Sequence, residues 1–110
     1  MKYSIFILED AERDILDIYR YIMINESKSL ADKFFDSLYK KIISLRTQPE
    51  RGHYPKELRL LGIFEYLEIT LKPYIIIYRI INKKVFVYCV LDGRRDLQKL
   101  LQERLLRVNL

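Results

Sequence analysis

Two arginines and two aspartates surround one glycine near the end of the chain, in the sequence LDGRRD of residues 91–96. An apolar run precedes this segment and helical spacing follows it, so Gly93 is expected to form a turn between a strand and a helix. Asp96 suits the start of that helix, where negative charge is favoured, whereas arginines there are disfavoured by the helix dipole. Arg94 and Arg95 are therefore predicted either to contact a partner or to form salt bridges with the neighbouring aspartates.

His53 is the only histidine of the chain, and it lies in a loop that holds two prolines and a glycine. A histidine can act as a general base when a carboxylate orients it, and Glu50 and Glu57 are close in sequence. A single loop histidine is more often simply exposed. A direct chemical role for His53 is therefore the less favoured of two interpretations.

Nine tyrosines provide rings that could stack on RNA bases beside the basic residues. Three of them, Tyr19, Tyr21 and Tyr39, fall in predicted helices, and strand tyrosines commonly line the edge of a core with a hydrated hydroxyl. The tyrosines that stay candidates for binding are Tyr66, Tyr74, Tyr78 and Tyr88.

Size and composition indicate one soluble globular domain over residues 1–110, with half of the residues apolar and about a third charged. No nucleotide-binding loop, zinc spacing, nucleophile elbow or acidic metal cluster occurs, so most enzyme classes, metals and cofactors are not expected. The single cysteine, Cys89, cannot form an internal disulfide. Because the first apolar stretch is too short for a signal peptide or a membrane span, a cytoplasmic location without a membrane partner is expected.

The net charge of +5 is concentrated in the second half of the chain. Residues 1–50 carry 8 Lys and Arg against 9 Asp and Glu, and residues 51–110 carry 12 against 6, which gives −1 and +6. Such a basic surface could attract nucleic acid, an acidic protein segment or an anionic membrane, or it could only keep the protein soluble. The working surface is predicted to lie in the second half, around residues 91–96.

The first half of the chain predicts a strand followed by two helices. Residues 2–8 are typical of a strand. Helical spacing over residues 11–24 predicts a first helix with Asp10 as its cap. Ser29, with an acidic residue three positions later, resembles a cap for a second helix, which Pro49 ends. Because so few residues join them, the helices should form an antiparallel hairpin.

The second half predicts a loop, three strands and a closing helix. The loop covers residues 49–55, and the strands cover residues 64–72, 74–81 and 85–91. Helical spacing returns over residues 95–107. The fold class is thus α+β: a strand, an α-helical hairpin, a three- to four-stranded antiparallel sheet and a C-terminal helix.

A sheet that is apolar on both faces must be covered on both, and the helical hairpin covers one of them. The closing helix is too short for all of the second face. An aromatic row is therefore expected to stay partly open as a groove for a partner, and it includes Tyr66, Tyr78, Phe86 and Tyr88.

Four pieces of the sequence form a recognisable set by their order and spacing. They are Ala11, Asp14 and Ile18-Tyr19 in the first helix, Pro49-Glu50-Arg51-Gly52 after the second, the strand Tyr74-Ile75-Ile76-Ile77-Tyr78-Arg79, and above all Val90-Leu91-Asp92-Gly93-Arg94-Arg95-Asp96-Leu97. In this set the chain resembles the RelE/ParE superfamily of toxins from bacterial type II toxin–antitoxin systems, over nearly its whole length. The resemblance implies growth arrest, a role in plasmid stabilisation and a cognate antitoxin as first partner.

The superfamily divides by target. RelE-type members are ribosome-dependent endonucleases of mRNA, which hold the phosphate with cations and use a tyrosine or histidine near the C-terminus. Arg95 matches their arginine after the last strand, but their strand arginine falls near Thr70 and their C-terminal tyrosine near Leu101. ParE-type members lack this set and bind DNA gyrase. The resemblance therefore favours inhibition of DNA gyrase, with the ribosome and mRNA as alternative targets and an inactive stability module as a third possibility.

Two sets of site residues follow from the resemblance. On the ParE-like interpretation the arginines of the turn are contacts before they are catalysts, and the binding residues are Arg94, Arg95, Lys72, Tyr66, Tyr78 and Tyr88. On the nuclease interpretation the catalytic candidates are Arg95, His53 and Arg51. A different cationic site could also form from Arg51, His53, Lys56, Arg59 and Lys72.

Overall fold

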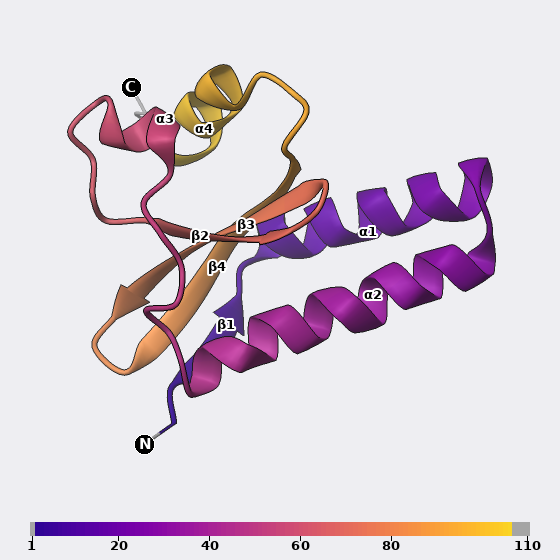
Figure 1. The fold of residues 1–110 in the computed structure, drawn as a ribbon, viewed down its shortest axis with the longest axis horizontal. Helices are drawn as coiled ribbons and strands as arrows, with labels where there is room; N and C mark the ends of the chain where they lie inside the picture. The colour runs from indigo at the N-terminus through magenta and orange to yellow at the C-terminus, as the bar shows by residue number, and fades with distance from the viewer. Residues whose placement is uncertain (1, 107–110) are drawn as a thin grey trace.

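Four strands form one sheet, and helices cover both of its faces (Figure 1). The computed structural model describes residues 2–106. Along the chain the elements are β1 (Ser4–Ile7), α1 (Glu9–Asn25), α2 (Lys28–Ile43), a 3₁₀ turn (Ser44–Arg46), α3 (Lys56–Arg59), β2 (Leu67–Leu71), β3 (Tyr74–Ile81), β4 (Lys84–Asp92) and α4 (Leu97–Leu105). Within the described residues, no helix is long and apolar enough to cross a membrane.

The order of the strands in the sheet is β1-β4-β3-β2. β2, β3 and β4 form an antiparallel meander, and β1 adds as a fourth strand, parallel to β4. The predicted α+β fold, with its helical hairpin, sheet and C-terminal helix, is confirmed. The final residue expected in the last helix, Arg107, lies outside the described residues.

The two predicted helix caps are wrong. α1 begins at Glu9 without any side-chain cap, so Asp10 lies inside the first turn. α2 begins two residues earlier than expected, and its cap is Ser27, whose hydroxyl accepts a hydrogen bond of 3.1 Å from the backbone N–H of Leu30. Serine is favoured at a helix N-cap, and here the first of the two serines takes that position while Ser29 lies inside the helix.

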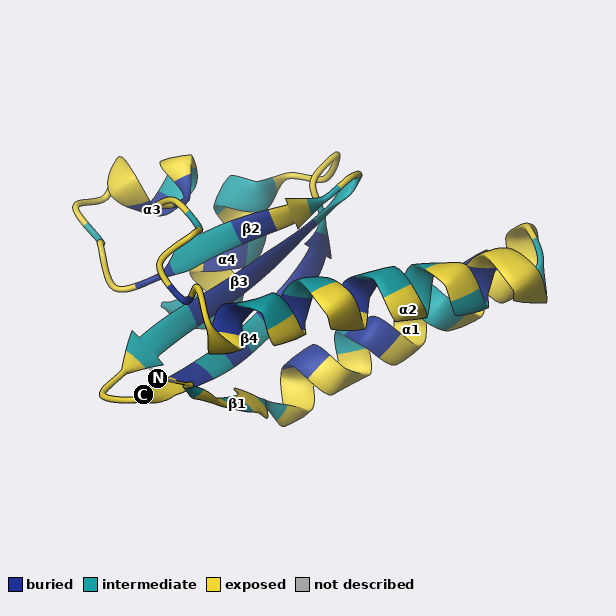
Figure 2. Ribbon diagram, turned by 60° about the horizontal axis from the view of Figure 1, so that its bottom comes forward, coloured by how far each residue is buried: buried dark blue, intermediate teal, exposed yellow. Residues whose placement is uncertain are grey.

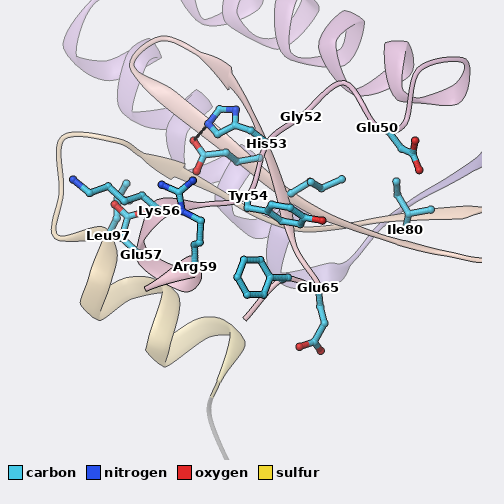
Figure 3. A pocket seen from close by; sticks show the side chains of 13 residues that line it. Glu50, Gly52, His53, Tyr54, Lys56, Glu57, Arg59, Glu65, Ile80 and Leu97 are labelled. Atoms are coloured by element: carbon cyan, nitrogen blue, oxygen red, sulfur yellow. Dashed lines mark ion pairs between the residues drawn. The ribbon is translucent and has the colours of Figure 1, made fainter. Parts of the chain in front are cut away.

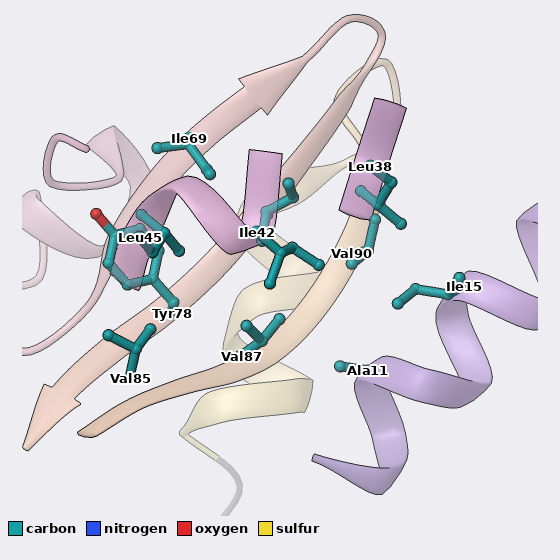
Figure 4. Close-up of a cluster of buried hydrophobic side chains, with 11 residues drawn as sticks. Ala11, Ile15, Leu38, Ile42, Leu45, Ile69, Tyr78, Val85, Val87 and Val90 are labelled. Carbon is teal, nitrogen blue, oxygen red and sulfur yellow. The ribbon is translucent and has the colours of Figure 1, made fainter. Parts of the chain in front are cut away.

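The larger core lies between the helical hairpin and the sheet (Figure 4). Ala11 and Ile15 of α1 and Leu38 and Ile42 of α2 point toward the sheet, as the apolar spacing predicts. The strands contribute six buried residues to the same core, namely Ile69, Ile76, Tyr78, Val85, Val87 and Val90.

The second face of the sheet is covered by α3 and α4, each through one fully buried leucine, Leu58 and Leu101 (Figure 2). They pack on Ile75 and Ile77 of β3 and on Cys89 of β4. Burial raises the pKa of the Cys89 thiol to about 12. The short helix α3 falls just after the predicted loop, where a helix of only four residues leaves little periodicity to detect.

The prediction of an open aromatic groove is wrong for two of its four residues. Tyr78 is fully buried in the hairpin-side core, and Tyr66 is only 7% exposed on the other face, where its ring meets that of Tyr88 edge-on at 5.2 Å. The residue after Tyr66 pairs with Tyr78, so the two tyrosines must lie on opposite faces. Phe86 is half-buried and stacks on the exposed Phe6 at 5.3 Å.

One carboxylate joins three elements. Asp14 of α1 accepts a hydrogen bond of 3.0 Å from the backbone N–H of Val90 in β4. The same carboxylate accepts two hydrogen bonds, of 3.0 and 2.9 Å, from the guanidinium of Arg104 in α4. Both side chains of this ion pair are largely buried, so it fixes the C-terminal helix to the first helix past the edge of β4.

The buried hydroxyl of Tyr78 gives a direct test of the fold. It donates a hydrogen bond of 2.6 Å to the carbonyl of Pro49 and accepts one of 3.1 Å from the N–H of Gly52. Tyr78→Phe leaves both backbone groups without this partner, so we expect the free energy of unfolding in urea to fall by about 1–3 kcal/mol. Tyr39→Phe, which removes an exposed hydroxyl, is the control and should leave it unchanged.

Candidate functional site

A hollow of about 950 Å³ lies between the loop after α2, the start of β2 and the first residue of α4 (Figure 3). Charged side chains dominate its lining, and they are Glu50, His53, Lys56, Glu57, Arg59, Glu65 and Glu68.

Backbone contacts hold the loop against the sheet. His53 and Glu68 exchange two backbone hydrogen bonds, of 3.1 and 2.8 Å, which pair the loop with β2 as an isolated bridge. Behind them the hydroxyl of Tyr78 binds Pro49 and Gly52. A Cβ atom at Gly52 would lie 2.6 Å from both the Glu68 carbonyl oxygen and the Tyr78 hydroxyl, so only glycine fits. The loop is thus positioned before any ligand arrives.

His53 has a carboxylate partner, but not one of the two expected from sequence. Its Nε2 lies 3.4 Å from Oε2 of Glu68, whereas Glu50 and Glu57 line the hollow without pairing with it. The Glu68 side chain is 12% exposed and that of His53 is 70% exposed. A largely buried carboxylate therefore faces an imidazole that solvent and ligands can reach.

Burial raises the pKa of Glu68 above its ordinary value of 4.5, and His53 partly opposes that rise. The folded protein therefore binds a proton at higher pH than the unfolded chain does. The stability that Glu68 contributes is fully present below pH 4.5 and is lost as the pH rises through the folded pKa.

The proposed set of five cationic residues divides among different hollows. Lys56 and Arg59 lie in the same hollow as His53. Arg51 instead donates a hydrogen bond of 2.6 Å to the hydroxyl of Ser44, outside that hollow. Lys72 lines a separate hollow beside the helical hairpin. An imidazole with two cations remains, which could bind a phosphate and take up a proton.

The two arginines of the turn have different surroundings. Arg94 binds Asp92 through Nε and Nη2, at 2.9 and 2.7 Å, and this guanidinium lowers the pKa of Asp92 to about 2. Asp96 lies at the N-terminus of α4 as expected, and it caps the helix by accepting a hydrogen bond from a backbone N–H three residues later. Arg95 is exposed and forms no ion pair with the described residues. The sequence left open whether these arginines form salt bridges or contact a partner. Arg94 forms a salt bridge, and Arg95 is free to contact a partner.

The same turn packs against the turn between β2 and β3. The N–H of Gly93 donates a hydrogen bond of 2.7 Å to the carbonyl of Pro73, and a Cβ atom at Gly93 would lie 2.9 Å from that oxygen. Arg94 and Lys72 consequently line one hollow of about 510 Å³, with the half-buried ring of Tyr74. Two predicted binding residues are thus brought together there, and three others, Tyr66, Tyr78 and Tyr88, lie elsewhere.

The positions that would complete a nuclease set around Arg95 hold unsuitable side chains. Thr70 of β2 is exposed, and Leu101 of α4 is fully buried against the sheet. Neither side chain carries a positive charge for a phosphate or a group that transfers protons at neutral pH. Within residues 2–106, no group of three or more His, Cys, Asp and Glu side chains is placed to hold a metal ion.

Comparison with known proteins gives a family. Residues 5–97 match the profile of the ParE toxin of the type II toxin–antitoxin system parDE. This match covers most of the chain, which therefore belongs to the ParE toxin family, within the ParE/RelE superfamily of type II toxins. No curated protein matches the chain in sequence.

Solved structures share the fold at low identity. The chromosomal ParDE system from P. aeruginosa has a chain similar at a TM-score of 0.69, with 16% identity over 83% of this chain and 96% of that one. The RelBE2 toxin–antitoxin complex from Mycobacterium tuberculosis gives 0.59, with 16% identity over 84% and 99%. A free RelE variant from E. coli gives 0.58, with 20% identity over 99% and 100%.

Substitutions of two residues that act on Glu68, His53 and Glu57, should move its pKa in opposite directions. His53→Ala removes the imidazole that lowers this pKa, so the pKa should rise further. Glu57→Gln removes a charge that raises it, so the pKa should fall. Carboxyl-carbon NMR titration of Glu68 measures both changes. A shift in the same direction in the two variants would contradict the described pairing.

Proposed function

We propose that this toxin arrests growth in the cytoplasm by binding DNA gyrase and inhibiting it. The observation that most supports this proposal is the burial of Leu101, at the position where a nuclease of the superfamily would need a proton donor. With Thr70 at the second position, Arg95 stands without a catalytic set. An exposed arginine beside a rigid turn is well suited to protein contact, because guanidinium groups are frequent anchors of interfaces.

The proposed contact surface is the turn of residues 92–96 with the hollow next to it. Lys72, Tyr74 and Arg94 line this hollow, and Arg95 lies beside it in sequence. The hydrogen bond between Gly93 and the β2–β3 turn holds these parts together, so little ordering is needed on binding.

The proposed function includes neutralisation by a cognate antitoxin. The P. aeruginosa and M. tuberculosis structures are of toxin–antitoxin systems, and the second is a toxin–antitoxin complex. The basic character of this chain is compatible with an acidic protein partner.

A gyrase supercoiling assay with the purified protein tests the proposal. The wild type should inhibit supercoiling, and Arg95→Ala should raise the inhibitory concentration about tenfold, as the loss of one charged anchor implies. Arg20→Ala removes an exposed arginine of α1 and is the matched control, which should inhibit as the wild type does. Full gyrase activity at micromolar excess of the wild-type toxin would refute gyrase as the target.

RNA cleavage is a second candidate, which the pair of His53 and Glu68 favours. The oriented imidazole could remove the proton from a 2′-hydroxyl, while Lys56 and Arg59 hold the phosphate in the same hollow. This set would replace the superfamily's usual one rather than complete it.

Primer extension on mRNA after induction separates the second candidate from the first. If the toxin cleaves mRNA, stops should appear within codons, and His53→Ala should reduce them about a hundredfold because a general base is lost. Arg51→Ala is the control, since Arg51 binds Ser44 outside the hollow and its loss should leave cleavage intact. Intact transcripts during growth arrest would eliminate this candidate.

A further inference from the structure

The C-terminal end of α2 carries an exposed apolar pair. Tyr39 and Ile43 are 41% and 49% exposed, and they lie four residues apart, so they are neighbours on one helix face. That face differs from the buried face of α2, which Ala31, Leu38 and Ile42 form. Tyr39 packs on Phe35 of the same helix, with ring centroids 4.8 Å apart, but neither Tyr39 nor Ile43 belongs to the core.

The pair lines a hollow of about 430 Å³ with a ring of positive charge. Lys2, Lys40 and Arg46 line the same hollow, and no carboxylate of residues 2–106 does. Within the described residues, none of the three cations forms an ion pair. The helix dipole accounts for Lys40 in the last turn of α2, but Lys2 and Arg46 lie outside the helix. We define the basic–apolar patch as these three cations with Tyr39 and Ile43.

The composition of the patch selects the chemistry of its occupant. Three unpaired cations around an apolar hollow complement a segment that carries carboxylates on either side of an apolar side chain. A nucleic acid requires a longer track of phosphate contacts, commonly six or more. The hollow has room for an apolar side chain, whereas membrane binding depends on a broader apolar face.

We propose that the basic–apolar patch docks an acidic segment of the cognate antitoxin, with one apolar side chain between Tyr39 and Ile43. This inference rests on the proposed partnership with an antitoxin. The patch lies at the end of α2 that is distant from the α1–α2 connection, whereas the hollow of Arg94 lies beside Ile22, Glu26 and Leu30 near that connection (Figure 1). The antitoxin would thus hold the toxin at a surface separate from the proposed gyrase contact.

Calorimetry with the purified antitoxin encoded beside the toxin gene tests this inference. In the double variant Lys40→Glu and Arg46→Glu, the dissociation constant should rise about tenfold at low salt, and the difference should shrink as salt increases. Ile43→Ser should weaken binding without that salt dependence. The double variant Arg20→Glu and Lys33→Glu makes the same change in net charge elsewhere on the hairpin and should bind as the wild type does.

The possible results distinguish a wrong docking site from a wrong partner. If the wild type binds and the patch variants bind equally well, the docking site is refuted and the partnership stands. If the wild type does not bind the antitoxin, the proposed partnership itself fails. Loss of binding to RNA or to anionic vesicles in the patch variants, with antitoxin binding intact, would also overturn the inference. Because all the substituted side chains are exposed, unchanged thermal unfolding confirms that the variants fold.

Discussion

The sheet is apolar on both faces, so both faces must be covered from water, and the rest of the structure depends on this constraint. The central strand β3 has four consecutive buried residues, from Ile75 to Tyr78, which point alternately to the two sides. Each side needs a cover, and the chain supplies a long hairpin for one and two short helices for the other. The nine-residue helix α4 packs on the sheet through Leu101, and the ion pair between Asp14 and Arg104 also joins it to α1. The ion pair thus connects the helices that cover opposite faces of the sheet.

The need to cover both faces also determines where polar side chains can meet a ligand. The faces are filled, so polar side chains gather at the ends of strands and in the loop before β2. Tyr78 connects the two regions, since its ring is part of the core and its hydroxyl fixes the loop that carries His53. A core residue therefore controls the geometry of the hollow, although it has no exposed atom there.

The sequence predicted the periodic parts of the fold well. β3 has the bounds expected from its apolar run, Tyr74–Ile81, and the hairpin follows from spacings of three and four. The groove failed because Leu67, and not Tyr66, pairs with Tyr78, so Tyr78 lies in the hairpin-side core, while Tyr66 is buried under the shorter helices on the other face. Glu68 was missed as the partner of His53, since the bridge joins residues fifteen apart that no local pattern relates. The different roles of Arg94 and Arg95 depend on side-chain rotamers, which residue types do not specify.

The only thiol of the chain lies beneath the smaller cover. Cys89 is fully buried against Leu101, and its raised pKa keeps it protonated and unreactive while α4 is docked. A thiol reagent can reach it only when α4 separates from the sheet or the whole domain unfolds. The rate of alkylation at Cys89 therefore reports how often the C-terminal helix separates from the sheet. It can follow that motion in the unmodified protein without an added probe.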